Sequence, residues 1–216
     1  NKVLKTDYTV SLGDLEQMIS DAQTIRECGF EVIKVKLGDN PNKDILRVKS
    51  IRTQIGDEIP LRLDANQGWD VESAIRVLNE LAPYNIQFCE EPIPRWNFME
   101  LSRIKNSVPV MIMADESCCD HHDAKRLIEL EAAQSFNIKL GKSSGIFKAQ
   151  KIIQLAEKAN LQLQIGGFLE SRIGFTASAH LALTSEQVLF CDFDTPMMFS
   201  EDPVLGGTQY GKNGLV

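Results

Sequence analysis

The stretch EVIKVKLGDN, residues 31–40, decides the fold, because an apolar run typical of a buried strand also carries two lysines. Successive side chains of an extended chain point to opposite faces, so Ile33 and Val35 share one face while Lys34 and Lys36 share the other. Two ammonium groups buried side by side are costly unless anions compensate them. We therefore expect acidic groups next to these lysines.

The same kind of run recurs along the chain, separated each time by an amphipathic stretch of helical length. The predicted strands are residues 7–12, 31–37, 59–65, 86–91, 110–115, 135–140, 161–166 and 188–194. The predicted helices are residues 14–29, 43–56, 71–83, 98–106, 122–132, 146–160 and 172–185. This alternation indicates right-handed βαβ units and a parallel sheet.

Eight such units predict the α/β class and favour a closed TIM-type (β/α) barrel. An open doubly wound sheet remains possible. A dinucleotide-binding version of that sheet would carry GxGxxG after its first strand, where residues 11–17 read SLGDLEQ. We expect one domain, residues 1–216, since no linker-like segment divides the chain.

The composition of the 216 residues excludes several functional classes. A net charge of −7 without a basic stripe argues against nucleic-acid binding. No apolar run approaches the roughly 20 residues that cross a bilayer, and no leader opens the chain, so we expect a cytoplasmic protein without membrane contact. The five cysteines are scattered and lack CxxC spacing, which indicates neither a disulfide framework nor a structural zinc site.

Polar residues mark the ends of the predicted strands at intervals of 24 to 28 residues. In chain order they are Lys36, Asp64, Glu90, Asp115, Lys139 and Asp192, with Gly166 in the corresponding place on the seventh strand. The carboxyl ends of parallel barrel strands meet on one rim, where active sites are built. We therefore expect these side chains to converge.

Taken singly, an acid at a strand end is more often a helix cap, and a lysine there usually reaches solvent. Three consecutive strands that end in acid, between strands that end in lysine, favour a functional interpretation. Asp64, Glu90 and Asp115 supply hard oxygen ligands that suit Mg²⁺ better than zinc. None of the three histidines is placed to compete for a zinc role.

The lysines are candidates for proton transfer. A lysine with a pKa of about 10.4 is a poor base at neutral pH, but a neighbouring ammonium or divalent cation favours its neutral form. Lys34 beside Lys36 would act in this way, and Lys139 should face Lys36 across the rim. Such a pair could remove a proton from one face of a substrate and return it to the other. Alternatively, Lys34 is a structural charge paired with a local acid.

As a set, the motifs KVKLG, LDAN, CEEP, ADES, NIKLGK and DFD resemble the barrel domain of the enolase superfamily. Within its muconate-lactonizing subgroup, they are most similar to the dipeptide epimerases of the L-Ala-D/L-Glu epimerase type. The resemblance covers nearly the whole chain and implies a modified (β/α)7β barrel. It also implies an N-terminal α+β capping domain, to which nothing here corresponds, and a homo-oligomeric full-length protein.

The resemblance implies a role for each matching residue. Asp64, Glu90 and Asp115 would bind Mg²⁺, and Lys36 and Lys139 would be the acid/base catalysts with Lys34 in support. The implied reaction is Mg²⁺-dependent epimerisation of a dipeptide, by proton transfer at the α-carbon of the C-terminal residue through an enediolate.

The last strand and two loops point to the substrate. Asp192 and Asp194 share a face and suit the free α-ammonium of a dipeptide, although Asp194 could instead cap the next segment. By resemblance, Lys34 and Thr9 would also contact substrate. The stretch GGFLES, with Gly167 and Leu169, would line the side-chain pocket, with space beside the glycine and an apolar wall at Phe168.

Three rival interpretations stay open. The first is another enolase-type enzyme, such as a muconate-type cycloisomerase, an o-succinylbenzoate synthase or a dehydratase. The second is a Schiff-base aldolase with Lys139 as its nucleophile. The third is a ligand-binding barrel without catalysis.

Overall fold

A computed structural model describes residues 3–201 and 203–216, and it places eight parallel strands in the sequential order β1 to β8. The strands are β1 (Tyr8–Val10), β2 (Ile33–Lys36), β3 (Leu61–Asp64), β4 (Ile86–Glu90), β5 (Met111–Ala114), β6 (Ser135–Lys139), β7 (Gln162–Gly166) and β8 (Val188–Cys191). All eight predicted strands are confirmed. Each is shorter than predicted.

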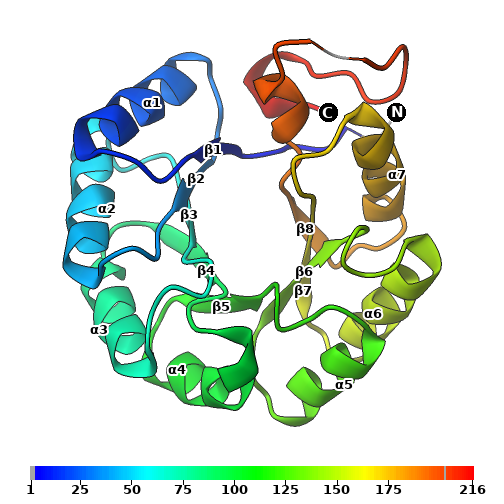
Figure 1. Ribbon diagram of the computed structural model, residues 1–216, viewed down its shortest axis with the longest axis horizontal. Coiled ribbons are helices and arrows are strands. Elements are labelled where there is room, and N and C mark those ends of the chain that lie inside the picture. The colour runs from blue at the N-terminus through cyan, green and yellow to red at the C-terminus, as the bar shows by residue number, and fades with distance from the viewer. Residues whose placement is uncertain (1–2, 202) are drawn as a thin grey trace.

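In the described residues seven α-helices surround the strands, which line the centre of the molecule (Figure 1). They are α1 (Leu15–Glu27), α2 (Pro41–Ile55), α3 (Val71–Leu81), α4 (Leu101–Ser107), α5 (His121–Glu129), α6 (Ile146–Lys158) and α7 (Arg172–Ala182). Strand β8 is followed by the short 3₁₀ turn η2 (Thr195–Met198) in place of an eighth α-helix. The expected (β/α)7β architecture is confirmed.

The barrel is open along one seam. Among the described residues no strand ladder joins β8 to β1, so the fully closed cylinder expected from the sequence needs this correction. Single hydrogen bonds bridge the seam: the Asp7 amide donates to the Cys191 carbonyl at 3.3 Å. The Phe193 amide donates to Thr6 Oγ1 at 2.7 Å.

Strand β2 resolves the conflict between its apolar and charged residues. Ile33 and Val35 are fully buried in the apolar core, which the helices cover. Lys34 points the other way, into the barrel, and only 1% of its surface is exposed. The barrel interior therefore holds charged groups, while the apolar core lies outside the strands.

Arg62 of β3 is another interior charge, and the sequence did not single it out. Its guanidinium donates to Asp7 Oδ2 at 2.7 Å. It also lies 5.5 Å from the ring centroid of Phe88 and 4.9 Å from that of Phe190. Carboxylate pairing and two aromatic faces compensate for the burial of this charge.

Side-chain caps fix the starts of several helices, α2 and α5 among them. The side chain of Asn40 accepts the amides of Asn42 and Lys43 at the start of α2. Asp120 and Asp123 form a capping box at the start of α5. The segment before α4 begins earlier than predicted, with the 3₁₀ turn η1 (Arg95–Glu100).

The two chain ends lie together near α7 (Figure 1). Leu4 and Val216 exchange two backbone hydrogen bonds of 2.9 Å, and Lys5 forms an antiparallel bridge with Leu215. In the part of the chain that the structure describes, no helix has the length and apolar character required to cross a membrane.

Candidate metal and proton-transfer site

The strand register brings the predicted site residues to one end of the barrel. Lys36 is the register partner of Asp64, and Asp64 is the register partner of Glu90. Asp115 follows the last residue of β5 directly. Neighbouring parallel strands in register direct paired side chains to the same face, so these four project together into the barrel.

Lys34 lies among carboxylates from three other strand ends. Its Nζ is 3.1 Å from Asp64 Oδ2, 2.8 Å from Glu90 Oε2 and 2.8 Å from Asp192 Oδ2. Burial by itself lowers the pKa of Lys34, but these carboxylates outweigh it and raise the pKa well above its ordinary value. The partners come from distant parts of the chain, so Lys34 is not merely paired with a local acid.

The two predicted catalysts each contact one of the predicted metal ligands. Lys36 Nζ is 2.6 Å from Asp64 Oδ2, and Lys139 Nζ is 2.5 Å from Asp115 Oδ2. Lys36 belongs to β2 and Lys139 to β6, four strands apart in the sheet order. The two amines therefore approach the barrel centre from separate walls.

The carboxylates around Lys139 act against the lowered pKa that the sequence led us to expect of a proton-transferring lysine. Burial acts to lower the pKa of Lys139, but the nearby Asp115 and Glu90 carboxylates raise it above its ordinary value. The neighbouring ammonium of Lys34 has only a smaller opposing effect. Carboxylates, rather than other amines, dominate the surroundings of these lysines.

The carboxylates differ in their affinity for protons. Burial acts to raise the pKa of Glu90, but Lys34 and Lys139 hold it well below its ordinary value. Burial raises the pKa of Asp115 to about 6, with a further contribution from Glu90, and Lys142 and Lys139 oppose this. Glu90 is thus the more firmly ionised of these two metal-ligand candidates.

The donor types of Asp64, Glu90 and Asp115 suit a hard divalent cation, but among the described residues the acidic group close enough to share one ion is Asp7, Asp192 and Asp194. Asp64, Glu90 and Asp115 are each at most 1% exposed and offer only carboxylate oxygens. Oxygens of Asp64 and Glu90 already converge on one positive charge, the Lys34 ammonium. Their assignment as metal ligands remains a prediction.

A second group of carboxylates lies beside the first. Asp7, Asp192 and Asp194 each offer an oxygen within 4.8 Å of the others. Burial, followed by the Asp192 charge, raises the pKa of Asp194 to about 7. The sequence indicated Asp192 and Asp194 but missed Asp7. The sequence did contain a signal for Asp7: side chains alternate along the strand DYTV, so Asp7 lies on the same strand face as Thr9.

Asp194 does not cap the segment that follows it. Its side chain makes no capping hydrogen bond to η2 and instead accepts the Thr9 amide at 2.7 Å through Oδ2. Its other oxygen, Oδ1, is buried and has no hydrogen-bond partner among the described residues. The predicted substrate residues Thr9 and Asp194 are therefore in direct contact, and one carboxylate oxygen is left for a ligand.

Two further residues of the site were not found from the sequence. Asn137 donates to Glu90 Oε1 at 2.7 Å from inside the barrel. Lys142 Nζ lies 3.0 Å from Asp115 Oδ1. Asn137 could have been found from the sequence, because side chains alternate along a strand and Asn137 therefore shares a face with Lys139. Lys142 ends the motif NIKLGK, but no role was inferred for it from the sequence.

The barrel and its charged interior have counterparts among known proteins. Residues 17–216 match the family model described as enolase C-terminal domain-like. The chain belongs to this family.

Several relatives of this enolase-family barrel have described activities. The D-Ala-D/L-Ala epimerase of Cytophaga hutchinsonii is 52% identical over 216 residues, which are all of this chain and 59% of the relative. The L-Ala-D/L-Glu epimerase of Clostridium acetobutylicum is 39% identical over 99% of this chain and 60% of the relative. The chain thus spans about 60% of the length of these curated relatives.

A solved structure agrees closely with the fold. The crystal structure of a Cytophaga hutchinsonii dipeptide epimerase, in complex with Mg and the dipeptide D-Ala-L-Val, superposes with a TM-score of 0.98 at 52% identity. The match covers all of this chain and 58% of that one.

The loop after β7 differs in part from expectation in this enolase-family barrel. A side chain at Gly167 would meet the Phe175 ring at 2.6 Å, so the space expected beside this glycine is filled. The apolar wall is Phe168, whose ring centroid lies 5.2 Å from Lys139 Nζ. Leu169 is 71% exposed. Of the three, Phe168 is the one beside a predicted catalyst.

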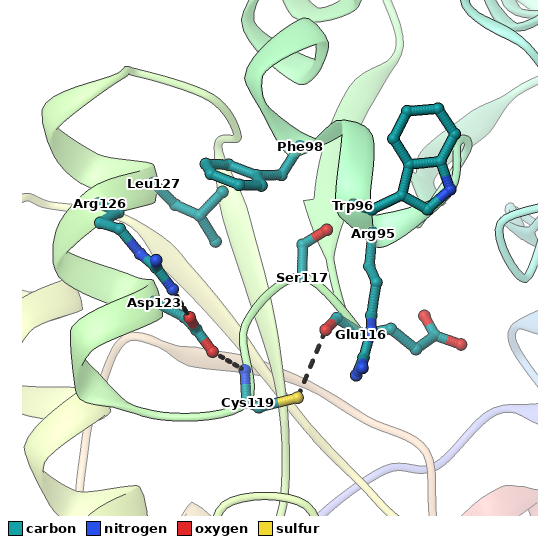
Figure 2. A pocket seen from close by; sticks show the side chains of 9 residues that line it. All are labelled: Arg95, Trp96, Phe98, Glu116, Ser117, Cys119, Asp123, Arg126 and Leu127. Atoms are coloured by element: carbon teal, nitrogen blue, oxygen red, sulfur yellow. Dashed lines mark hydrogen bonds and ion pairs between the residues drawn. The ribbon is translucent and has the colours of Figure 1, made fainter.

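A cavity of about 300 Å³ lies next to the turn that follows β5 (Figure 2). Its wall includes Glu116, Ser117 and Cys119 from the turn, and Asp123 and Arg126 from α5. Asp123 accepts the Cys119 amide at 3.0 Å and pairs with Arg126. None of the predicted catalytic or metal-binding residues lines this cavity.

Proposed function

We propose that this chain is the catalytic barrel of a Mg²⁺-dependent dipeptide epimerase, which inverts the α-carbon of the C-terminal residue. The observation that carries the proposal is the pair Lys36 and Lys139, on strands four apart, each in contact with a carboxylate of the Asp64, Glu90 and Asp115 set. The names of the epimerase relatives support it.

Asp64, Glu90 and Asp115 are the residues that would hold the Mg²⁺. When bound, the ion would serve as a Lewis acid toward the carboxylate of the substrate. Lys34 contacts Asp64 and Glu90 on one side and Asp192 on the other. It would therefore keep the metal-binding and substrate-binding carboxylates at a fixed separation.

The lysines would move the proton. With the substrate between β2 and β6, one amine would take the α-proton from one face while the other ammonium delivers a proton to the opposite face. Exchange of these roles accounts for reaction in both directions. Asn137 and Lys34, both hydrogen-bonded to Glu90, would hold its carboxylate in place during the transfer.

Asp192 and Asp194 would bind the α-ammonium of the dipeptide. The Thr9 amide fixes Asp194 Oδ2, and Oδ1 is free to accept from the ligand. Phe168, with Leu169 and Gly167 in the same loop, would border the C-terminal side chain. An apolar border favours small apolar residues, in line with the D-Ala-D/L-Ala relative.

A cycloisomerase is the alternative within the same family, because a muconate lactonizing enzyme also superposes with a TM-score of 0.92 at 33% identity. Substrates of that kind lack a cationic end. They provide no reason for the buried acidic pair Asp192 and Asp194.

The test is incubation of the intact protein with alanine-containing dipeptides and Mg²⁺ in D₂O, followed by proton NMR. We expect α-deuteration and epimerisation of Ala-Ala substrates, faster than of L-Ala-L-Glu. Lys36→Ala and Lys139→Ala should each lower kcat at least about 100-fold, whereas Lys151→Ala on α6 should not. Absence of exchange with every dipeptide would reject the epimerase in favour of the cycloisomerase. Borohydride inactivation with a carbonyl substrate would support an aldolase.

A further inference from the structure

The turn of residues 115–118, directly after β5, is held from one side by Glu91. The Asp115 amide donates to Glu91 Oε2 at 2.7 Å, and the Ser117 amide donates to the same oxygen at 3.2 Å. The Ser117 hydroxyl donates to Glu91 Oε1. Both oxygens of this fully buried carboxylate are therefore used by one short turn.

Lys142 holds the same turn from the other side. Its ammonium donates to the carbonyl of Asp115, to that of Cys118 at 2.8 Å and to that of Asn137 at 2.7 Å. It also lies 3.0 Å from Asp115 Oδ1, and its side chain is only 8% exposed. An ammonium has three donors, and here all three are directed at carbonyl oxygens.

The two residues come from opposite neighbours of the turn. Glu91 follows β4 and Lys142 follows β6, while the turn itself follows β5. The Glu91 carboxyl group thus binds the amides of the turn and the Lys142 ammonium binds its carbonyls. The backbone on both sides of the Asp115 Cα is fixed by these two side chains instead of by the sheet ladder, which ends at Ala114.

Glu91 adopts a conformation that supports this role. Its φ is +36°, in the left-handed region that non-glycine residues seldom occupy. Its amide donates to the Met113 carbonyl at 2.9 Å. The unfavourable backbone conformation is what turns the side chain toward the β5 turn while Glu90 faces the barrel.

We propose that Glu91 and Lys142 are positioning residues that together hold the Asp115 carboxylate in the orientation required for metal binding. This inference rests on the proposed function, in which Asp115 is a metal ligand. Neither residue touches substrate. Residues that orient a metal ligand affect metal affinity strongly even when they do not contact the metal themselves.

The test measures binding of Mn²⁺, used as a spectroscopic probe for the Mg²⁺ site, to the intact protein by electron paramagnetic resonance. Glu91→Ala and Lys142→Met should each weaken Mn²⁺ binding about 10- to 100-fold. Glu91→Gln retains an acceptor for the two amides and should recover most of the affinity. At saturating Mg²⁺ the kcat of these variants should fall less than the affinity does.

Matched controls come from the same neighbourhood. Glu116→Ala removes the acid next to Asp115 in the sequence, at the wall of the cavity of about 300 Å³ (Figure 2). Lys148→Met removes a lysine near the start of α6. Both should bind Mn²⁺ as the unchanged protein does. If one of Glu91→Ala and Lys142→Met does not fold, the other still tests the proposal, because each should weaken Mn²⁺ binding on its own.

Asp115→Asn separates the two proposals. If Asp115→Asn leaves Mn²⁺ binding unchanged, Asp115 is not a ligand and the proposed metal site is wrong. If Asp115→Asn weakens binding while folded Glu91→Ala and Lys142→Met variants bind normally, the metal site stands and the positioning role is rejected. If Glu91→Gln binds Mn²⁺ as weakly as Glu91→Ala, the hydrogen bonds that the side-chain oxygen accepts from the turn do not hold Asp115 in place. That result also rejects the positioning role.

Discussion

At the scale of single residues, Lys34 is the central charge of the barrel interior. It contacts Asp64, Glu90 and Asp192, which come from three strand ends that are separate in the sequence. These carboxylates are buried, so each of them depends on a nearby cation for compensation. The alternation in residues 31–37 predicted that Lys34 needs anions. It could not predict which ones, because that depends on how the strands close around it.

Replacement of Lys34 by methionine leaves these carboxylates without their shared cation. We expect Lys34→Met to lower the free energy of unfolding by about 3–5 kcal/mol, the usual loss when one partner of a buried ion pair is removed. The measurement is urea unfolding of the metal-free intact protein. Lys49→Met, which removes an exposed pair with Glu80, is the matched control and should unfold at the same urea concentration as the unchanged protein.

Asp194 makes stability depend on pH. Its pKa is raised to about 7 by burial and by Asp192, so between about pH 4 and 7 the folded state binds more protons at this group than the unfolded state. The free energy of unfolding contributed by Asp194 therefore falls as pH rises through this window. Urea unfolding at pH 5 and pH 7.5 should show a smaller difference for Asp194→Asn than for the unchanged protein. If the stability difference between the two pH values were equal in Asp194→Asn and the unchanged protein, the raised pKa of Asp194 would be contradicted.

At the scale of secondary-structure elements, the periodicity of apolar residues predicted which elements form and which faces they bury. It did not predict where the elements end. The residue pattern of β2 predicted its two faces correctly, because apolar and charged side chains alternate without interruption. It could not show that the ladder ends at Lys36, since the Leu37 amide still donates to the Asp64 carbonyl at 2.8 Å beyond the strand. The start of η1 at Arg95 was missed because residues 95–97 carry no helical apolar period.

Helix α5 offers a direct test of a local signal. The Asp120 side chain accepts the amides of His122 and Asp123, and these hydrogen bonds lower the pKa of Asp120 despite a smaller opposing effect of burial. We expect Asp120→Ala to lower the free energy of unfolding at pH 7 by about 1 kcal/mol. Thermal unfolding measures this loss, and Glu58→Ala in an exposed loop is the control.

The sign of the pH effect follows from the lowered pKa. The stabilisation by Asp120 is present above the ordinary carboxylate pKa and is lost as pH falls through the lower pKa of the folded state. The difference between Asp120→Ala and the unchanged protein should therefore shrink in acid. A difference that grows toward low pH would contradict the capping role.

At the scale of the whole molecule, the fold and the rim were predictable because strand ends recur at a nearly constant interval. Polar strand ends at 24- to 28-residue spacing are enough to define a ring of side chains at one end of a barrel. The seam between β8 and β1, the Asp7 and Arg62 pair and the Lys142 contacts were not predictable. They depend on side chains that meet only when the ring has formed.

Metal binding should be visible in the stability of the whole protein. If the folded state alone binds Mg²⁺, saturation at about 100 times the dissociation constant adds about 2.7 kcal/mol. We expect calorimetry of the intact protein to show a higher Tm with Mg²⁺ and a lower one with a chelator. Asp64→Asn should abolish this difference. A Tm of the unchanged protein that is insensitive to Mg²⁺ over a wide concentration range would contradict the site.

The pairing of Leu4 with Val216 should govern how the barrel responds to a force applied between these two residues. Leu4 and Val216 lie side by side in antiparallel orientation, so a force that separates the two ends loads their hydrogen bonds one after another, as in unzipping. Mechanical unfolding should therefore start at the Leu4–Val216 hydrogen bonds and then open the seam between β8 and β1. From there it should proceed through the neighbouring strands toward the opposite side of the barrel. A tether through residues in the middle of the chain would have to shear several strands at once and should resist a larger force.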